Sequence, residues 1–295
     1  MIGLDLATSA LIDRPDVVEQ AARGRFGPFA EQALQLAEQG FCLLDLRDEA
    51  FPLVAEQIRV ALEPQFDLES WRQGRAANLR LQDGWRFCSA ISSLAGHPLV
   101  LQLLETLYGR SPFCFQTLNF PVGSQQHFHS DALHFHSYPF GFMCGVWIAL
   151  EDIQAGSGPL VYYPGSHRLP YCSAESEGFS PEQVAAEPHP QRLFEPFWRQ
   201  QVKQGGFAAE SFLPRQGQAL IWHANLLHGG LPVQQRQLTR WSQVSHYYFH
   251  GCLYTTPMHS FCLADGGARL RNPIDVGQPK RRYSHSDGIL VTPAV

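Results

Sequence analysis

Two histidines and one aspartate are the residues of this sequence best suited to metal chemistry. His129 and Asp131 are separated by one residue, and His228 lies far downstream. If the first pair lies on a β-strand, both side chains share one face, because side chains alternate along a strand. Two imidazoles and one carboxylate form a facial triad that leaves positions open on a metal, as in non-haem Fe(II) oxygenases. The pattern therefore predicts an iron centre held by His129, Asp131 and His228.

An arginine after the distal histidine suggests a co-substrate. Arg240 lies twelve residues after His228, and a guanidinium can bind a carboxylate through two hydrogen bonds. A buried arginine without an anionic partner would be costly, so a ligand carboxylate is a natural partner. We therefore expect a keto acid on the metal, with its far carboxylate at Arg240. Arg236 is the second candidate for this role, and a structural ion pair with Asp or Glu is the alternative.

Two stretches, residues 126–168 and 217–247, resemble a known enzyme family. The first contains H-S-D and a P-G-S-H turn, and the second contains H-G-G followed by Arg240. Together they resemble the phytanoyl-CoA dioxygenase family of Fe(II)/2-oxoglutarate oxygenases, which includes ectoine hydroxylase, and the similarity extends over most of residues 40–250. The resemblance implies Fe(II) as the metal, with 2-oxoglutarate and O2 as co-substrates and succinate and CO2 as products.

The resemblance also distinguishes between two candidate distal ligands. The family's ligand is the histidine of the H-G step, which here is His228, whereas His223 ends the preceding strand and is expected to be a neighbour of the site. Close backbone packing at the ligand would explain Gly229 and Gly230. The family often has a hydroxyl-bearing residue where Gly230 stands, so one hydrogen bond to the co-substrate is expected to be missing or replaced.

Three further residues are implied as binders of 2-oxoglutarate. Gln116 and Asn119 stand where related oxygenases hold the carboxylate beside the keto group. Their three-residue spacing puts them on opposite faces of a regular strand, so both serve only if the strand has a bulge. Trp147 matches a family tryptophan that lines the co-substrate pocket, although core packing explains it equally well. Asp131 favours hydroxylation over halogenation, because related halogenases replace this carboxylate with a small residue.

Other histidines leave two alternative functions open. His127 and His129 form an H-F-H, which occurs again at 134–136. A cupin-like metal-binding protein would use His127, His129 and a further histidine without Arg240, although no glutamate stands at the cupin position. A catalytically silent sensor or scaffold of the same fold is the second alternative, and the complete triad argues against it. A second His-Ser-Asp at 285–287 is expected to be a coincidence.

The order of periodic segments predicts a mainly β fold. Three segments have helical periodicity: residues 28–39, 48–62 and 97–109. A buried strand follows Gly40, which should end the first helix. Six β-rich runs come later, separated by glycine and proline turns: residues 112–120, 126–131, 142–150, 159–163, 218–223 and 241–250. Helices followed by many short strands favour a double-stranded β-helix, that is, a jelly-roll or cupin-like core, backed by N-terminal helices.

We expect one oxygenase domain over residues 1–295. Its helical part covers about residues 1–110, its jelly-roll core about 111–250, and its tail from 264 is expected to be irregular. Residues 172–210 interrupt the core with a polar segment that contains a predicted helix at 190–203. An insertion of this length is often functional, so a lid over the iron or a partner-binding element stands beside a plain surface excursion. As a lid, it would be mobile without substrate and ordered over the site with substrate.

Composition restricts partners and location. The chain has a net charge of −5 and no basic block, so no nucleic-acid partner is expected. Seven widely spaced cysteines without C-x-x-C indicate reduced thiols and a cytoplasmic location. The sequence has neither a secretion signal nor a run of about eighteen apolar residues, so no membrane association is expected. The sequence does not predict the oligomeric state.

The sequence gives only a general indication of the substrate. Arg75, Arg80 and Arg86 lie in the helical part, where they could meet an anionic or sugar-like molecule, although a solvated charged face is the simpler explanation. No strongly apolar groove identifies a fatty acyl substrate, so the substrate in the family name is not carried over. We expect a small polar metabolite or a biosynthetic intermediate.

Overall fold

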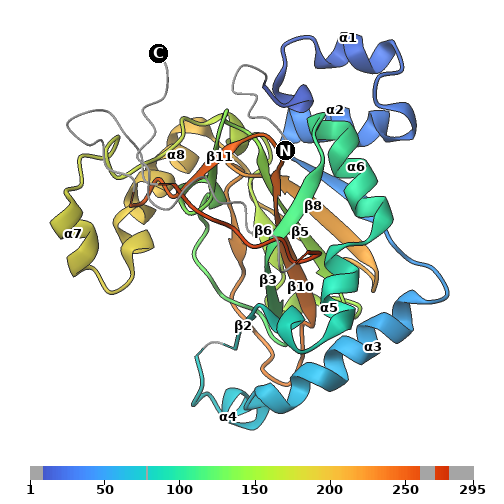
Figure 1. The fold of residues 1–295 in the computed structure, drawn as a ribbon. Coiled ribbons are helices and arrows are strands. Elements are labelled where there is room, and N and C mark those ends of the chain that lie inside the picture. The colour runs from blue at the N-terminus through green and yellow to red at the C-terminus, as the bar shows by residue number, and fades with distance from the viewer. Residues whose placement is uncertain (1–8, 78, 260–269, 279–295) are drawn as a thin grey trace.

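The fold is built around one large antiparallel sheet. The computed structural model describes residues 9–77, 79–259 and 270–278 of the chain (Figure 1). The order of the six strands in the main sheet is β1-β8-β5-β10-β3-β2. In chain order these strands are β1 (Phe41–Asp45), β2 (Leu81–Gln82), β3 (Pro112–Phe120), β5 (Met143–Ala149), β8 (Gln218–His223) and β10 (Ser242–Phe249).

Two smaller sheets complete the β-structure of the described residues. One has the order β7-β6-β9, and the other pairs β11 with β4. Their strands are β4 (His136–Tyr138), β6 (Leu160–Tyr162), β7 (Glu210–Phe212), β9 (His228–Gly230) and β11 (Leu253–Thr255). The main sheet and the β7-β6-β9 sheet do not close into a continuous barrel.

Helices lie on two sides of this β-structure (Figure 1). Six of the α-helices lie before β3 in the chain: α1 (Val17–Ala22), α2 (Ala30–Gln39), α3 (Phe51–Leu62), α4 (Leu68–Arg72), α5 (Ser89–Ala95) and α6 (Pro98–Tyr108). Two belong to the insertion: α7 (Pro181–Ala186) and α8 (Glu195–Gly205). Short 3-10 turns are η1 (Leu11–Asp13), η2 (Gly27–Phe29), η3 (Glu63–Gln65), η4 (Gly84–Arg86), η5 (Asp131–Leu133), η6 (Ala155–Ser157), η7 (Ser166–Arg168) and η8 (Pro190–Leu193).

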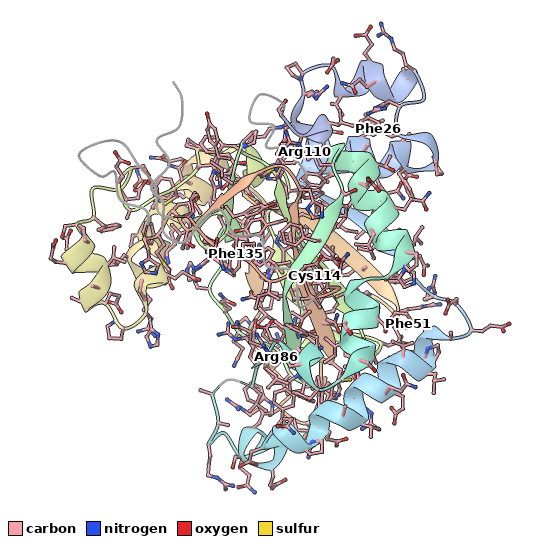
Figure 2. All side chains as sticks on the ribbon, in the orientation of Figure 1. Phe26, Phe51, Arg86, Arg110, Cys114 and Phe135 are labelled. Atoms are coloured by element: carbon pink, nitrogen blue, oxygen red, sulfur yellow. The ribbon has the colours of Figure 1, made fainter. Side chains whose placement is uncertain are left out.

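The largest hydrophobic core lies between the N-terminal helices and the main sheet. Phe51 of α3 and Cys114 of β3 belong to it and are labelled in Figure 2. Gly40 and Gly109 follow α2 and α6 with φ of 81° and 78°, a left-handed conformation that glycine adopts without strain. The predicted helix ends at these two glycines are therefore confirmed.

One predicted strand is wrong, and it carries two of the candidate ligands. Residues 126–131 do not form a strand: His129 makes only an isolated bridge, and Asp131 begins η5. The chain turns here because the Ser130 side chain accepts a hydrogen bond from Ala132 N, and Ala132 N also donates to Ala224 O. The side chains of His129 and Asp131 thus lie on the same side because the chain turns between them, and not because side chains alternate along a strand.

Several smaller expectations can be compared with the described residues. The other predicted strands and helices are present within a few residues of their expected ends, but β1 and β2 join the main sheet although they lie before residue 110. The six described cysteines are buried and form no disulfide. No helix in the described part of the chain has the length and apolarity needed to cross a membrane. Cys262, most of the tail from 264 and the second His-Ser-Asp lie outside the described residues.

A glycine on a central strand leaves space for a large side chain beside the candidate ligands. Gly145 of β5 is paired with Trp222 of β8 on one side and His246 of β10 on the other. A Cβ atom at Gly145 would lie 2.2 Å from Trp222 Cζ2. The indole therefore lies across the sheet only because residue 145 has no side chain.

Gly145→Ala should therefore destabilise the protein. Overpacking of a close-packed interior typically costs about 1–3 kcal/mol, and we expect a decrease of that size in the free energy of unfolding measured with urea. Gly277→Ala is the control, since Gly277 is exposed and its added Cβ would lie 3.3 Å from a single side-chain oxygen. This control should change stability by less than about 0.5 kcal/mol. Equal stability of the wild type and Gly145→Ala would contradict the packing argument.

Candidate metal centre

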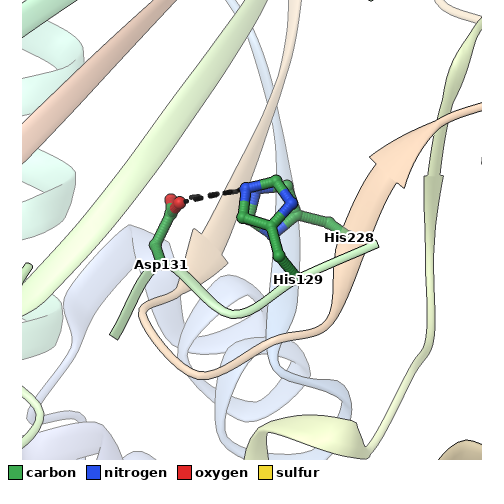
Figure 3. Close-up of side chains that lie close together, drawn as sticks. All are labelled: His129, Asp131 and His228. Atoms are coloured by element: carbon green, nitrogen blue, oxygen red, sulfur yellow. Dashed lines mark ion pairs between the residues drawn. The ribbon is translucent and has the colours of Figure 1, made fainter. Parts of the chain in front are cut away.

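The structure brings His129, Asp131 and His228 together in the interior. One ligand atom from each lies within 4.8 Å of the others, and all three residues are buried. His129 Nε2 lies 3.5 Å from Asp131 Oδ1, and His228 Nε2 lies 3.8 Å from Asp131 Oδ2. Figure 3 shows the carboxylate pointing toward the two imidazole rings. This is the only group of three or more potential metal ligands among the residues that the structure describes.

Two reciprocal backbone hydrogen bonds place the two histidines side by side. His129 N donates to His228 O at 2.9 Å, and His228 N donates to His129 O at 3.0 Å. The following glycines permit this approach, since an added Cβ would lie 2.7 Å from Gln126 O at Gly229 and 2.6 Å from Ser124 Oγ at Gly230. The prediction that close backbone packing explains the H-G-G sequence is confirmed.

Backbone carbonyls orient both imidazoles. His129 Nδ1 lies 3.0 Å from His127 O, and His228 Nδ1 lies 2.9 Å from Leu226 O. A neutral ring that donates from Nδ1 keeps a lone pair on Nε2, the atom that faces Asp131. Burial lowers the pKa of His228 to about 4, so this ring is neutral at physiological pH and free to bind a metal.

Asp131 is held at one of its two oxygens. Trp222 Nε1 donates to Oδ2 at 2.8 Å, and His246 Nε2 lies 3.3 Å from the same atom. Burial by itself would raise the pKa of the Asp131 carboxyl, but the rings of His228 and His246 hold that pKa well below its usual value. The carboxylate is therefore charged, and its Oδ1 stays directed toward His129.

A cavity of about 350 Å³ opens beside the triad. Its walls include the three candidate ligands and these further residues: Arg80, Gln82, Gln116, Leu118, Phe120, Ser124, Gln126, His134, Phe135, Trp147, Leu160, Gln191, Trp222, Gly229, Arg240, Val244 and His246. Gln116 Oε1 lies 3.1 Å from His246 Nδ1, so Gln116 contacts the histidine that adjoins Asp131.

Asn119 does not belong to this cavity. Its Nδ2 donates to Gln243 Oε1 at 3.4 Å, and Gln243 Nε2 donates to Ile91 O of α5. The strand alternates regularly from Gln116 to Asn119, so the second side chain points to the face covered by the helices. The expectation that Asn119 binds the co-substrate is wrong.

Arg240 is a buried cation without a carboxylate partner. It is 2% exposed, and its Nη2 makes only a 3.5 Å hydrogen bond to Val122 O. Burial lowers its pKa to about 10, with a smaller opposing effect from Glu151, so the guanidinium remains charged at neutral pH. It forms no ion pair with any described residue, and Nε has no hydrogen-bond partner. Arg236 lies elsewhere, where it donates to Trp71 O and stacks on that indole.

Two other buried donors, one beside Arg240 and one on the cavity-facing side of β10, have no hydrogen-bond partner. Trp147, whose ring centroid is 5.6 Å from Arg240 Cζ, has no partner for Nε1, and Ser242 has none for Oγ. Strand alternation puts Ser242 on the same face as Val244 and His246, which line the cavity. Ser242 was not predicted from the sequence, although its position two residues after Arg240, on a strand, is a signal that could have identified it. Three unpartnered donors fit the carboxylate of a keto acid.

His127 and His223 make their contacts away from the triad. His127 Nε2 accepts a hydrogen bond from Arg199 Nε at 3.0 Å, in the insertion. His223 Nδ1 accepts from Asn225 N, and its Nε2 lies 3.5 Å from Asp13 Oδ1. The geometry therefore favours neither the cupin-like ligand set nor His223 as the distal ligand.

The insertion packs beside the metal centre. Phe194 and Trp198 are buried in a hydrophobic cluster that also contains Leu133 and Leu227, which lie next to the ligand-bearing segments. The ring centroids of Trp198 and His129 are 6.5 Å apart. Residues 172–210 are thus not on a face remote from the triad, and their movement on substrate binding stays a prediction.

Comparison with curated proteins gives local matches. Phytanoyl-CoA dioxygenase domain-containing protein 1 of Danio rerio is 34% identical over 67 residues, which cover 23% of this chain and 22% of that protein. The Mus musculus protein of the same name is 33% identical over 81 residues, which cover 25% and 27%. The matches therefore span about a quarter of the length of these relatives.

Solved structures show a similar fold over most of the chain. SnoN, a non-haem α-ketoglutarate-dependent epimerase of nogalamycin biosynthesis, has a TM-score of 0.54 and 22% identity over 89% of this chain and 94% of its own. SnoK, a carbocyclase of the same pathway, has a TM-score of 0.56 and 17% identity, covering 77% and 86%. EctD from S. alaskensis with bound Fe has a TM-score of 0.53 and 17% identity, covering 75% and 76%. These likenesses confirm the predicted jelly-roll fold backed by helices.

The family itself is shown by a match over more than half of the chain. Residues 58–240 match the model of the family described as Phytanoyl-CoA dioxygenase (PhyH). One neighbour of the same fold was solved with Fe3+ and α-ketoglutarate. The buried triad fits the metal, and Arg240, which has no carboxylate partner among the described residues, fits the keto acid. The chain therefore belongs to the phytanoyl-CoA dioxygenase family, whose members are Fe(II)- and 2-oxoglutarate-dependent oxygenases that use O2.

Proposed function

We propose that this protein hydroxylates a small polar metabolite or biosynthetic intermediate, with His129, Asp131 and His228 as the iron ligands. The observation that carries the proposal is the buried triad on the wall of a cavity that Arg240 also lines, since Arg240 has no carboxylate partner among the described residues. Asp131 supports hydroxylation over halogenation, since a halide would need the coordination position that its carboxylate takes. Neighbours with the same fold include an epimerase and a carbocyclase, so the reaction must be established from the product.

When bound, Fe(II) and 2-oxoglutarate supply the oxidation of a C–H bond by O2, with release of succinate and CO2. The chain's own residues hold the reactants in place, which is how a protein contributes most to cofactor chemistry. In this proposal Arg240, Trp147 and Ser242 bind the far carboxylate of 2-oxoglutarate, and Trp222 fixes the Asp131 carboxylate.

Gln116 is proposed to help orient the co-substrate. It lines the cavity and contacts His246, so its amide can donate toward the carboxylate next to the keto group. The insertion, which contributes Gln191 to the cavity and places Trp198 near His129, would limit the access of water.

The function is tested with purified protein under anaerobic conditions. Addition of 2-oxoglutarate to the Fe(II)-loaded protein should produce a weak visible charge-transfer band. After O2 is admitted, a screen of metabolite pools should yield succinate together with one compound that has gained an oxygen atom. Succinate coupled to an isomerised or cyclised product would keep the family chemistry and exclude hydroxylation, and absence of the band would argue for a protein without 2-oxoglutarate turnover.

The ligand assignment predicts which alanine variants lose Fe(II) and which retain it. Alanine at His129, Asp131 or His228 should abolish stoichiometric Fe(II) binding, because each change removes one of the three ligands. His127→Ala and His223→Ala are the matched controls and should retain the metal, as measured by calorimetry, with circular dichroism to verify the fold. Retention of iron by His228→Ala together with its loss in His127→Ala would overturn the assignment.

If Arg240 binds the far carboxylate of 2-oxoglutarate, its removal should weaken 2-oxoglutarate binding far more than Fe(II) binding. Truncation of one partner in a desolvated charge pair costs about 2–5 kcal/mol, so Arg240→Ala should weaken 2-oxoglutarate binding by that amount. Ser242→Ala should cost about 1.5–3 kcal/mol, as expected for a hydrogen bond to a charged group. Arg236→Ala, the control, should leave the affinity unchanged. Unchanged 2-oxoglutarate affinity in Arg240→Ala, measured by anaerobic calorimetry, would exclude the proposed pocket.

A further inference from the structure

A second cavity, which we call the antechamber, adjoins the one that contains the triad. It has a volume of about 490 Å³, and its walls include Ala77 and Arg80 on one side and Pro188, Arg192 and Glu195 of the insertion on the other. The two cavities have these lining residues in common: Arg80, Phe120, Ser124, Gln126, His134 and Gln191. A molecule held in the antechamber can therefore extend to the triad.

Positive charge predominates on the antechamber wall. Arg80 and Arg192 come from segments far apart in the sequence, and both line this space. Neither guanidinium has an ion pair or a side-chain hydrogen bond with a residue that the structure describes. Glu195 is the one acidic residue among the described lining residues, and its carboxylate pairs with Arg199 at 3.0 Å. The two arginines are thus available to an anion from outside the chain.

Hydrogen-bonding side chains occupy the passage between the antechamber and the triad. Gln191 Oε1 lies 3.0 Å from His134 Nε2 and 3.4 Å from Gln126 Nε2, and Gln126 Nε2 lies 3.4 Å from His129 Nε2. A chain of two amides and an imidazole forms hydrogen bonds with hydroxyl or carbonyl groups and suits them better than an alkyl chain.

Resting on the proposed function, we propose that the substrate has an anionic group, a phosphate or a carboxylate, which Arg80 and Arg192 bind in the antechamber. The neutral polar part of the substrate lies among Gln126, Gln191 and His134, and the carbon to be oxidised reaches the triad. Two guanidiniums on one anion form several charge-assisted hydrogen bonds with a fixed geometry. Since Arg192 belongs to η8 and Arg80 to the N-terminal part, the bound anion also links the insertion to the body of the protein.

The two outer arginines differ from their neighbours and from Arg240. Arg240 is buried, lines only the inner cavity and, in the proposed function, binds the co-substrate. Arg86, labelled in Figure 2, lines neither cavity, lies 4.0 Å from Asp83 Oδ2 and stacks on Trp85. Lys203 lies on α8 and also lines neither cavity. Arg86 and Lys203 therefore provide matched controls for the two segments.

The test uses the Fe(II)- and 2-oxoglutarate-loaded full chain in the absence of O2. Three probes of similar size are titrated by calorimetry: sn-glycerol 3-phosphate, D-glycerate and glycerol. We expect saturable binding of at least one anionic probe and none of glycerol. Arg80→Gln and Arg192→Gln should each weaken that binding about tenfold or more, as loss of a charged hydrogen bond implies. Arg86→Gln and Lys203→Gln should stay within about twofold of wild type, because exposed charges contribute little at a distance.

The anionic probe that binds distinguishes a phosphate from a carboxylate. Amide exchange provides a second measurement: the bound anion should slow exchange in residues 188–195 of the wild type and not in Arg192→Gln. Equal affinities in all five proteins, binding of glycerol as strong as that of the anions, or no saturable binding of either anion would overturn the inference. The 2-oxoglutarate charge-transfer band is recorded for every protein. Its presence in a variant verifies a folded site, whereas its absence in the wild type would contradict the proposed function itself.

Discussion

The site depends on two backbone hydrogen bonds between His129 and His228. They join the segment before η5 to β9, and they fix the separation of the two imidazoles before any side chain is considered. Side chains on Gly229 or Gly230 would push the two segments apart. Each ring is then oriented by a carbonyl two residues earlier in the chain, so the backbone determines both the position and the tautomer of the histidine ligands. The carboxylate is the exception, because a tryptophan and a histidine from the main sheet hold it.

Arg240 and Arg80 differ in how completely the protein removes them from water, and therefore in how strongly each can bind an anion. Arg240 is buried so deeply that its pKa decreases, yet it remains charged and forms no ion pair with a described residue. In the proposed pocket it would bind a small dicarboxylate selectively, because the protein has excluded water from around the charge. Arg80 is exposed, so an anion there competes with water and ions. Weak and reversible binding at Arg80 suits a substrate that must leave as product. Tighter binding at Arg240 suits a co-substrate that must stay until it is consumed.

The sequence patterns correctly predicted the features that depend on residues close together in the chain. Strand β3 was predicted with its observed ends, Gly40 and Gly109 ended their helices, and Gly229 and Gly230 mark a close backbone approach. The order of His129, Asp131, His228 and Arg240 along the chain was enough to indicate an iron site with a co-substrate, because a family pattern links these positions.

Features that depend on the packing of distant segments were not predictable. The strand expected at 126–131 is replaced by a turn, because Ala132 bonds to Ala224, ninety-two positions further along the chain. The contacts of Asp131 with Trp222 and His246 arise from two different strands of the main sheet. Asn119 was misassigned because its face depends on the regularity of β3, which sequence spacing alone does not reveal.

Asn225 ties the beginning of the insertion to the loop that carries the ligands. Its Oδ1 accepts from Ser130 Oγ at 2.8 Å, and its Nδ2 donates to Leu169 O at 2.7 Å. At the other end of the insertion, Phe212 of β7 is paired with Leu160 of β6. Both ends of residues 172–210 are thus held by the scaffold. Any displacement of this segment would therefore be largest near its middle, where η8 lines the antechamber.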